Sequence, residues 1–344
     1  MNIAILSPLW KKVPPEKYGG TELVVANLIN GLARLGHKVV TFACAGSQVD
    51  CELVEVIPDE MYNLAGGFKW DAIQSYEFLA YYKLGLRIND FDIVHNHMGV
   101  HPIALAPFIN VPFLTTLHSS LSSDFKHLED EFANENFVSI SLAQRKLAPN
   151  LNYIANVYHG IDINSFIPNY KPGTYLFFIG TLSYNKGIDI AVRTASKLNL
   201  PLIIAGEIRE SEKDFLNKEV FPLIDGEKIK FIGEVNHKEK AALYAGAKAL
   251  LFPSRWNEAF GLVIAESLAC GTPVIAMNNG SPSEIIENGK TGYTVNLEEE
   301  FVIATKNISE ISREICRSEA VARFSLLEMA KQYTDVYSKL INRK

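Results

Sequence analysis

The sequence predicts an α/β protein made of two domains, each a doubly wound parallel sheet with helices on both faces. Short apolar runs, typical of buried parallel strands, alternate with helical segments along most of the chain. The 344 residues, 48% of them hydrophobic, suffice for two separate cores. A stretch with two prolines at residues 161–174 interrupts the alternation, which indicates a linker between the domains.

The expected boundaries follow from this alternation. We expect the first domain at residues 1–160, the linker at 161–174 and the second domain at 175–320. The apolar pattern of residues 321–344 predicts one last helix from Val321 to Ile341. Earlier in the chain, Ser281-Pro282-Ser283-Glu284 has the order of a helix-starting capping box.

Charge and composition exclude several classes of protein. The formal net charge of −6 argues against a nucleic-acid partner, and no apolar run approaches the roughly 18 residues of a membrane-spanning helix. Met1 leads directly into an expected strand, so no signal peptide is predicted, and the four cysteines lack metal-binding spacing. We therefore expect a cytoplasmic protein without a transmembrane segment. Nothing in the sequence indicates a peripheral membrane contact or an oligomeric state.

The first domain begins with strand, loop, helix and strand. Ile3–Ser7 is the first strand, and Gly19 and Gly20 open the helix that follows the loop. Paired glycines at a helix N-terminus let the backbone approach a bound anion closely, although most such pairs only form turns. Further strands are expected at residues 37–43, 91–95, 113–117, 137–141 and 153–157.

Three histidines follow two of these strands. His97 and His101 come after the strand at 91–95, and His118 comes after the strand at 113–117. Their spacing fits no helical or hairpin pair of metal ligands and no cysteine pair accompanies them, so no metal site is expected. His118 at a strand end is better interpreted as a side chain that points into a cleft. A hydrogen-bonded histidine in the wall of the domain is the alternative.

The most informative stretch runs from Pro253 to Val274. It follows a buried strand at 247–252, continues as a polar loop, and becomes a helix that Gly261 opens and Gly271 closes. In a parallel sheet such a loop lies at the carboxyl ends of the strands, which is where ligands bind. This edge is therefore the predicted site.

The start of this helix combines anion-binding amides with carboxylates. The N–H groups of Phe260, Gly261 and Leu262 are free to bind a phosphate, while Glu258 just before them would repel one. Glu258 instead suits sugar hydroxyls beside a phosphate, and Glu266 within the helix suits ribose hydroxyls. These residues predict a sugar nucleotide as ligand. The alternative is that Glu258 is a solvated loop residue and that Glu266 lies on the wet face of the helix.

Lys186 lies in the loop after the strand at 175–180. Its flexible ammonium could reach a pyrophosphate at the strand edge. The alternative is an ordinary solvated lysine in a turn.

The residues from Phe260 to Val274 have the pattern Phe-Gly-Leu-x3-Glu-x2-Ala-x-Gly-x-Pro-Val, preceded by Glu258. This pattern resembles the retaining glycosyltransferases of family four, which have the GT-B fold. The resemblance is strongest at residues 1–45 and 175–295. The start Tyr18-Gly19-Gly20-Thr21-Glu22 resembles in particular the antibiotic and pterin glycosyltransferases of that family.

The resemblance implies a complete architecture. Two Rossmann-like domains would face each other across a cleft, with the first on the acceptor side and the second binding the nucleotide sugar. The helix predicted within residues 321–344 would cross back onto the first domain.

The resemblance also implies roles for individual residues. Gly19 and Gly20 would face the donor's pyrophosphate, and His118 would touch the donor sugar. Glu258 would orient the sugar, and Lys186 would stabilise the leaving diphosphate. Other donor-binding residues implied by the family pattern are Gly180 and Thr181 near the diphosphate, and Gly233 and Val235 in the segment that holds the base.

Thr181 departs from the family pattern, which has an arginine at this position. The departure puts the affinity for the donor in doubt and raises the question of which cation replaces the arginine. Arg255 is the nearest candidate in sequence, since a guanidinium can hold a phosphate with two parallel bonds. The alternative is that Arg255 packs on Trp256 or faces water.

The function implied is transfer of a sugar, with retention, from a UDP-linked donor to an acceptor in glycan, lipopolysaccharide or small-molecule glycoside synthesis. This hexosyltransferase would need no metal or other cofactor. Asp90-Phe91-Asp92, which looks like a metal-binding motif, precedes a strand at its amino end and is interpreted as a solvated turn. The rival functions are a GT-B sugar-nucleotide epimerase and a degenerate sugar-nucleotide-binding subunit.

Overall fold

The computed structural model describes residues 1–16, 19–64, 70–119 and 126–343. For residues 70–72 and 126–127 it describes the backbone and not the side chains. Tyr18 of the glycine-rich motif and Lys344 lie outside these ranges. Contacts divide the chain into two units, which are Met1–Ile161 with Ser325–Lys344, and Asp162–Phe324. Nearly all of the stretch expected to be a linker thus belongs to the second unit.

The first unit contains, in its described part, a parallel sheet of seven strands in the order β3-β2-β1-β4-β5-β6-β7. The strand order reverses between β1 and β4, so ligands are expected at the carboxyl ends of these two strands. The strands are β1 (Asn2–Leu6), β2 (Lys38–Cys44), β3 (Glu52–Ile57), β4 (Ile93–Asn96), β5 (Phe113–Thr116), β6 (Asn136–Ser139) and β7 (Tyr153–Asn156).

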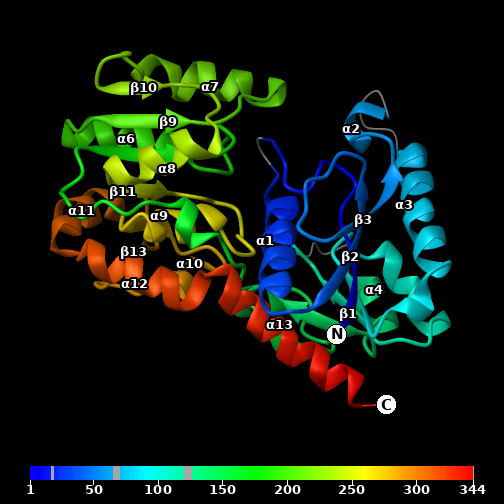
Figure 1. Cartoon of the computed structure of the whole chain (residues 1–344). Coiled ribbons are helices and arrows are strands. Elements are labelled where there is room, and N and C mark those ends of the chain that lie inside the picture. The colour runs from blue at the N-terminus through cyan, green and yellow to red at the C-terminus, as the bar shows by residue number, and fades with distance from the viewer. Residues whose placement is uncertain (17–18, 65–69, 120–125, 344) are drawn as a thin grey trace. The chain divides into compact units, whose positions relative to one another are not determined.

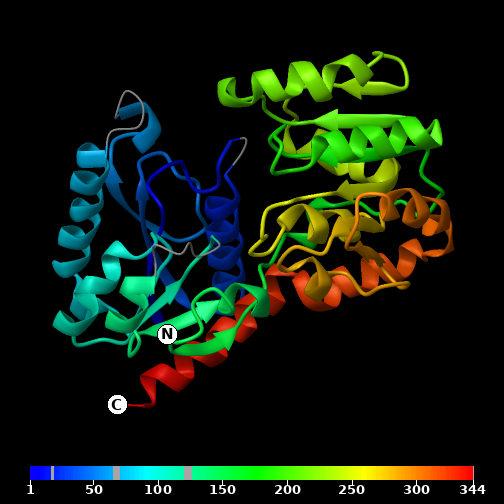
Figure 2. The ribbon, with the colours of Figure 1, turned by 180° about the vertical axis from the view of Figure 1, so that it is seen from behind.

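Helices cover both faces of this sheet. Figures 1 and 2 place α1 (Gly20–Arg34) and α3 (Trp70–Gly85) on opposite sides of it. A core that includes Leu6, Phe42 and Ile73 is buried around β1 and β2. The remaining helices of the unit are α2 (Met61–Leu64), α4 (Lys126–Glu131), α5 (Leu142–Arg145) and α13 (Leu326–Ile341).

The last helix packs against α1 within the first unit. Gly31 of α1 lies so close to α13 that a Cβ atom there would be 2.7 Å from the carbonyl oxygen of Leu326. The prediction of one helix from Val321 to Ile341 is wrong, because α12 (Arg313–Phe324) ends before Ser325. Ser325 is extended and caps α13, its side chain accepting the N–H of Glu328 at 3.2 Å.

The second unit contains, within the same described ranges, a parallel sheet of six strands in the order β10-β9-β8-β11-β12-β13. Its strand order reverses between β8 and β11. The strands are β8 (Tyr175–Ile179), β9 (Leu202–Ala205), β10 (Ile229–Phe231), β11 (Ala247–Phe252), β12 (Val274–Met277) and β13 (Gly292–Val295). The helices are α6 (Ile188–Leu198), α7 (Lys213–Glu219), α8 (His237–Gly246), α9 (Leu262–Ala269), α10 (Pro282–Ile285), α11 (Glu300–Asn307) and α12.

The capping box predicted at Ser281 is wrong. The Ser281 hydroxyl donates to the carbonyl oxygen of Phe260 at 2.6 Å and makes no cap for α10. A capping box instead begins α8, where Asn236 and Glu239 each accept the other's backbone N–H. Short 3-10 helices lie at Ile88–Asp90, His101–Phe108, Ile163–Ser165, Glu210–Glu212, Phe221–Leu223 and Ile308–Glu310.

Candidate functional site

The residues with the strongest predicted roles meet at the reversal point of the second sheet. Lys186 follows β8 and Glu258 follows β11, and these two strands are neighbours. The Lys186 ammonium lies 2.5 Å from Oε1 of Glu258, to which the Ser254 hydroxyl also donates at 2.6 Å. The Glu258 side chain is only 11% exposed. Glu258 is therefore not the solvated loop residue that the alternative interpretation assumed, while Lys186 is paired but partly exposed.

The two loops that carry these residues touch through backbone atoms. We call residues 180–187 the Lys186 loop and residues 253–261 the Glu258 loop. Gly187 has φ 71°, and a Cβ atom there would lie 2.0 Å from the carbonyl oxygen of Pro253. Glycine is thus required at this position both for the backbone conformation and for the close approach. The backbone of Glu258 is also fixed by a bridge to Gly280, which follows β12.

The Glu258 loop leads into the helix α9. Gly261 precedes the helix with φ 86°, and no side chain caps the helix end. Phe260 is buried beside it, while Gly261 and Leu262 are half-buried. The first N–H groups of a helix lack partners within the helix and attract anions. This end of α9, beside Glu258, is thus suited to a negatively charged group.

Glu266 is buried within α9, with 2% of its side chain exposed, so the interpretation that it lies on the wet face of the helix is wrong. Its Oε1 pairs with the Lys240 ammonium at 2.6 Å, and its Oε2 accepts the Tyr244 hydroxyl at 2.9 Å. Sequence reasoning missed Lys240 and Tyr244. Their spacing of four residues puts them on one face of α8, which is the available signal.

The other predicted donor-binding residues follow the neighbouring strands of this sheet. Thr181 after β8 donates its hydroxyl to Oε1 of Glu207 at 3.1 Å. Gly180 lies against the loop after β9, and Gly233 after β10 accepts the N–H of Gly206 at 2.8 Å. Val235 is half-buried directly before the cap of α8. All of these positions lie at the carboxyl edge of the sheet.

Arg255 does not hold the position of a phosphate-binding cation. Its guanidinium makes two 2.8 Å hydrogen bonds to the carboxylate of Asp189 and one of 2.6 Å to Glu298. It lies over the ring of Tyr184, 4.2 Å from the centroid, and not on Trp256. Both terminal nitrogens of the guanidinium are thus engaged within the protein, which argues against the hypothesis that Arg255 replaces the arginine missing at Thr181.

The first unit holds a chain of four buried or half-buried histidines. His95 ends β4, His97 follows it, His118 follows β5, and His159 follows β7. The ring nitrogens are 3.2 Å apart between His95 and His97, 2.8 Å between His97 and His118, and 3.4 Å between His118 and His159. Hydrogen bonds of 2.7 Å to the Tyr337 hydroxyl and 2.8 Å to the Thr116 hydroxyl complete the chain at His95.

Every imidazole–imidazole contact in this chain joins Nε2 of one ring to Nδ1 of the next. A neutral imidazole has one donor and one acceptor nitrogen, so four neutral rings satisfy one another when all carry the same tautomer. Burial lowers the pKa of His118 to about 3. Burial, with smaller contributions from neighbouring imidazoles, lowers the pKa of the other three rings well below its usual value. The chain is therefore neutral at pH 7.

These contacts favour the hydrogen-bonded wall histidine over the cleft side chain as the interpretation of His118. Both of its ring nitrogens have imidazole partners. His101 instead pairs with the carboxylate of Glu77 at 2.7 Å. Among the described residues no group of three or more histidine, cysteine or acidic side chains has the geometry of a metal site.

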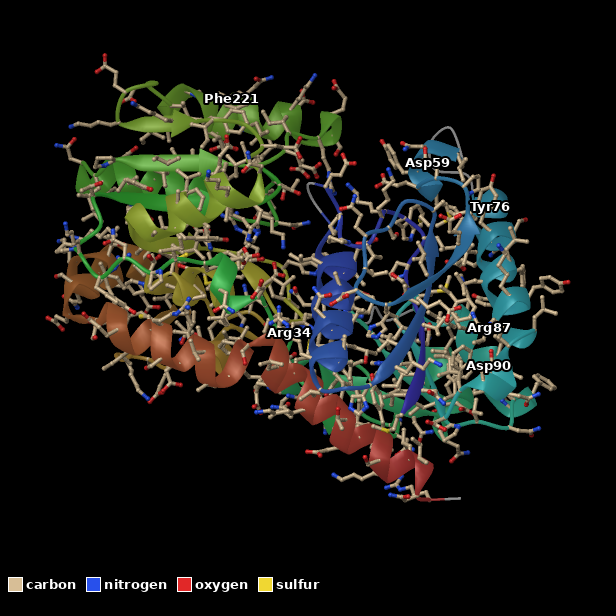
Figure 3. All side chains as sticks on the ribbon, in the orientation of Figure 1. Arg34, Asp59, Tyr76, Arg87, Asp90 and Phe221 are labelled. Atoms are coloured by element: carbon tan, nitrogen blue, oxygen red, sulfur yellow. The ribbon has the colours of Figure 1, made fainter. Side chains whose placement is uncertain are left out.

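The glycine pair and the two aspartates predicted in the first unit lie in the elements where the sequence predicted them. Gly19 and Gly20 stand at the start of α1. Asp90 and Asp92 lie at the amino end of β4, where Asp92 accepts the N–H of Asn2 at 2.7 Å. Asp90 pairs with Arg87 at 3.0 Å, and Figure 3 shows these two residues close together beyond α3.

Comparison with known proteins agrees with this arrangement. Residues 18–152 match the family model described as Glycosyltransferase Family 4, and residues 162–317 match the model described as Glycosyl transferases group 1. A glycogen synthase of Mycobacterium tuberculosis is 29% identical over 84% of this chain and 81% of its own.

Solved structures with the same fold include a glycosyltransferase and a protein in complex with a nucleotide sugar. AviGT4, involved in avilamycin A biosynthesis, has a TM-score of 0.75 and 22% identity over 100% of this chain and 99% of its own. Anabaena HepE in complex with UDP-glucose has a TM-score of 0.74 and 18% identity over 99% of this chain and 100% of its own.

Two doubly wound parallel sheets of this kind define a protein of the GT-B fold. The chain belongs to the glycosyltransferases of family four. Membership of the antibiotic and pterin subgroup stays a prediction. No helix in the described ranges combines the length and the apolar character needed to cross a membrane.

Proposed function

We propose that the chain is a retaining, metal-independent hexosyltransferase that moves a sugar from a UDP-linked donor to an acceptor. The observation that carries this proposal is the contact between Lys186 and Glu258 at the reversal point of the second sheet, beside the N-terminus of α9. A cation at the N-terminus of a helix suits a diphosphate, and a carboxylate beside it suits sugar hydroxyls.

In this proposal the second unit stabilises the leaving group. Lys186 and the amides before α9 hold the diphosphate, and Glu258 accepts hydroxyls of the donor sugar. The departing diphosphate takes the acceptor's proton on the same face of the sugar, which gives retention. Glu258 orients the sugar in this scheme and does not attack it, since the diphosphate itself takes the acceptor's proton. The two-carboxylate mechanism of glycosidases therefore does not apply.

Two observations support a nucleotide-linked donor, and the first of them favours UDP. HepE, which shares the fold, forms a complex with UDP-glucose. Glu266 is proposed to accept the ribose hydroxyls, since a carboxylate has lone pairs beyond those used by Lys240 and Tyr244. The base would lie on the backbone of Gly233 and Val235. The first unit would serve the acceptor side.

A thermal-shift screen of UDP-, ADP- and GDP-linked sugars tests the choice of donor. A ligand at about 100 times its dissociation constant stabilises the folded state by about 2.7 kcal/mol. We expect UDP-sugars to raise the melting temperature most. Failure of every nucleotide to raise it would contradict the proposal.

Product analysis separates this function from its rivals. Incubation with the stabilising donor and candidate acceptors should release UDP and give a glycoside with the donor's anomeric configuration, read by NMR. An isomerised UDP-sugar without free UDP would identify an epimerase. Binding without turnover under any condition would identify a degenerate subunit, an alternative that the threonine at position 181 keeps open.

A further inference from the structure

The Arg255 side chain connects the two loops that carry Lys186 and Glu258. Besides its carboxylate partners, the guanidinium donates to the carbonyl oxygen of Tyr184 at 2.8 Å and lies over the ring of the same residue. The backbone N–H of Arg255 donates to the carbonyl oxygen of Asn185, also at 2.8 Å. Arg255 thus contacts the two residues that directly precede Lys186.

The partner carboxylate of Arg255 lies on the other side of Lys186 in sequence. Asp189 is buried in the first turn of α6, three residues after Lys186. It holds Arg255 through both oxygens and also accepts from Arg193 at 2.7 Å. Burial alone would raise the pKa of Asp189, but hydrogen bonds and charges from Arg255 and Arg193 outweigh it and lower the pKa. The pair is therefore ionised at neutral pH.

The Lys186 loop is consequently fixed against the Glu258 loop at two points. Arg255 holds the residues before Lys186, and the close approach of Gly187 to Pro253 holds the residue after it. Lys186 itself reaches Glu258 across the short gap between these points. A bidentate guanidinium gives this connection a defined geometry that a lysine at the same position could not reproduce.

We propose that Arg255 is a positioning residue, which aligns Lys186 with Glu258 so that both act on one donor molecule. The inference rests on the proposed function. It assigns Arg255 no contact with the donor. A misplacement of about 1 Å can cost on the order of 100-fold in rate, so the loss of this connection should appear mainly in turnover.

The test compares Arg255→Lys and Arg255→Met with a matched control, Glu298→Gln. The control removes the charge of a partly exposed partner of Arg255 and leaves the bidentate contact with Asp189. We expect both Arg255 variants to lower kcat by more than about tenfold, on the order of 100-fold for Arg255→Met. The dissociation constant for UDP should rise much less, and Glu298→Gln should stay within about threefold of the parent in both quantities.

A double-mutant cycle with Glu258→Gln separates positioning from a merely structural role. If Arg255 acts through Glu258, Arg255→Met should lower kcat by less than about threefold in the Glu258→Gln background, while the changes in melting temperature add. Equal fold-losses of kcat in both backgrounds would overturn the inference.

Two further outcomes are distinguishable. A rise of more than about tenfold in the dissociation constant for UDP, with kcat unchanged, would show that Arg255 contacts the phosphate and would overturn the positioning role. A parent chain that turns over no donor would overturn the proposed function and this inference with it. A parent that is active beside variants with unchanged kcat would overturn this inference alone.

Discussion

Acidification should destabilise the first unit much more than the second. The four-histidine chain of His95, His97, His118 and His159 is neutral in the folded state, and their pKa values lie below the ordinary 6.5. The unfolded chain therefore binds more protons as the pH falls below 6.5. The stability contributed by keeping these rings neutral is present above that pH and is lost below it, down to about pH 3 for His118.

The magnitude follows from linkage. A ring that is protonated in the unfolded chain at pH 5.5 and stays neutral in the folded one costs on the order of 1 kcal/mol relative to pH 7.5. Four such rings together cost on the order of 5 kcal/mol. Glu22 in the same unit has its pKa raised by burial and offsets part of this loss. The net loss is of the same order as the whole stability of a small domain, roughly 5–15 kcal/mol.

Hydrogen exchange read by mass spectrometry can measure each unit separately. Opening free energies for peptides from β4 and β5, corrected for the intrinsic exchange rate, should fall by about 4–5 kcal/mol between pH 7.5 and 5.5. The opening free energies of peptides from β8 and β12 should fall by less than about 2 kcal/mol. Among the described residues of the second unit, His237 is the histidine whose pKa is lowered.

A variant tests whether the histidines cause this loss. His97→Gln removes one ring from the middle of the chain and should reduce the pH-dependent part by about a quarter, whatever it does to stability at pH 7.5. Equal losses in the two units, or no loss in the first, would refute the reasoning.

Three other predictions concern the binding of the donor and its transfer. Glu266→Ala should raise the dissociation constant for UDP, measured by calorimetry, if the ribose uses this carboxylate; unchanged UDP affinity with a lower melting temperature would restrict Glu266 to joining α8 and α9. Gly187→Ala should lower kcat at least tenfold, because the new Cβ would lie 2.0 Å from the carbonyl oxygen of Pro253 and the loops must separate; kinetics like those of the parent would contradict this. Transfer should persist in EDTA, and activity that chelation abolishes and Mn²⁺ restores would bring Asp90 and Asp92 back into consideration.

The sequence was informative where a local pattern determines the structure. Apolar runs predicted β1, β8 and β11, and glycines marked the N-terminal ends of α1 and α9. The edge strand β3 was not predicted, because Glu52–Ile57 is only partly buried and shows no continuous apolar run. The single helix predicted from Val321 failed because extended Ser325 interrupts a continuous amphipathic pattern.

The sequence predicted which loops form the candidate site, but it did not predict which side chains of these loops contact one another. Lys186 and Glu258 were each assigned to the sheet edge, but their direct contact depends on β8 and β11 being neighbours. The pairing of Lys240 with Glu266 and of Arg255 with Asp189 likewise joins residues far apart in sequence. Such pairs follow from strand order, which the order of elements along the chain does not specify.

The most direct test of the donor site is the affinity for UDP of Lys186→Met, beside the matched control Lys218→Met. Lys218 lies in the same unit, and its side chain is 82% exposed. If Lys186 holds the diphosphate, its loss should raise the dissociation constant for UDP by more than about tenfold, since a charge-assisted hydrogen bond contributes about 1.5–3 kcal/mol. Lys218→Met should bind UDP like the parent. Unchanged affinity in Lys186→Met, or equal losses in both variants, would contradict the assignment of this site to the nucleotide sugar.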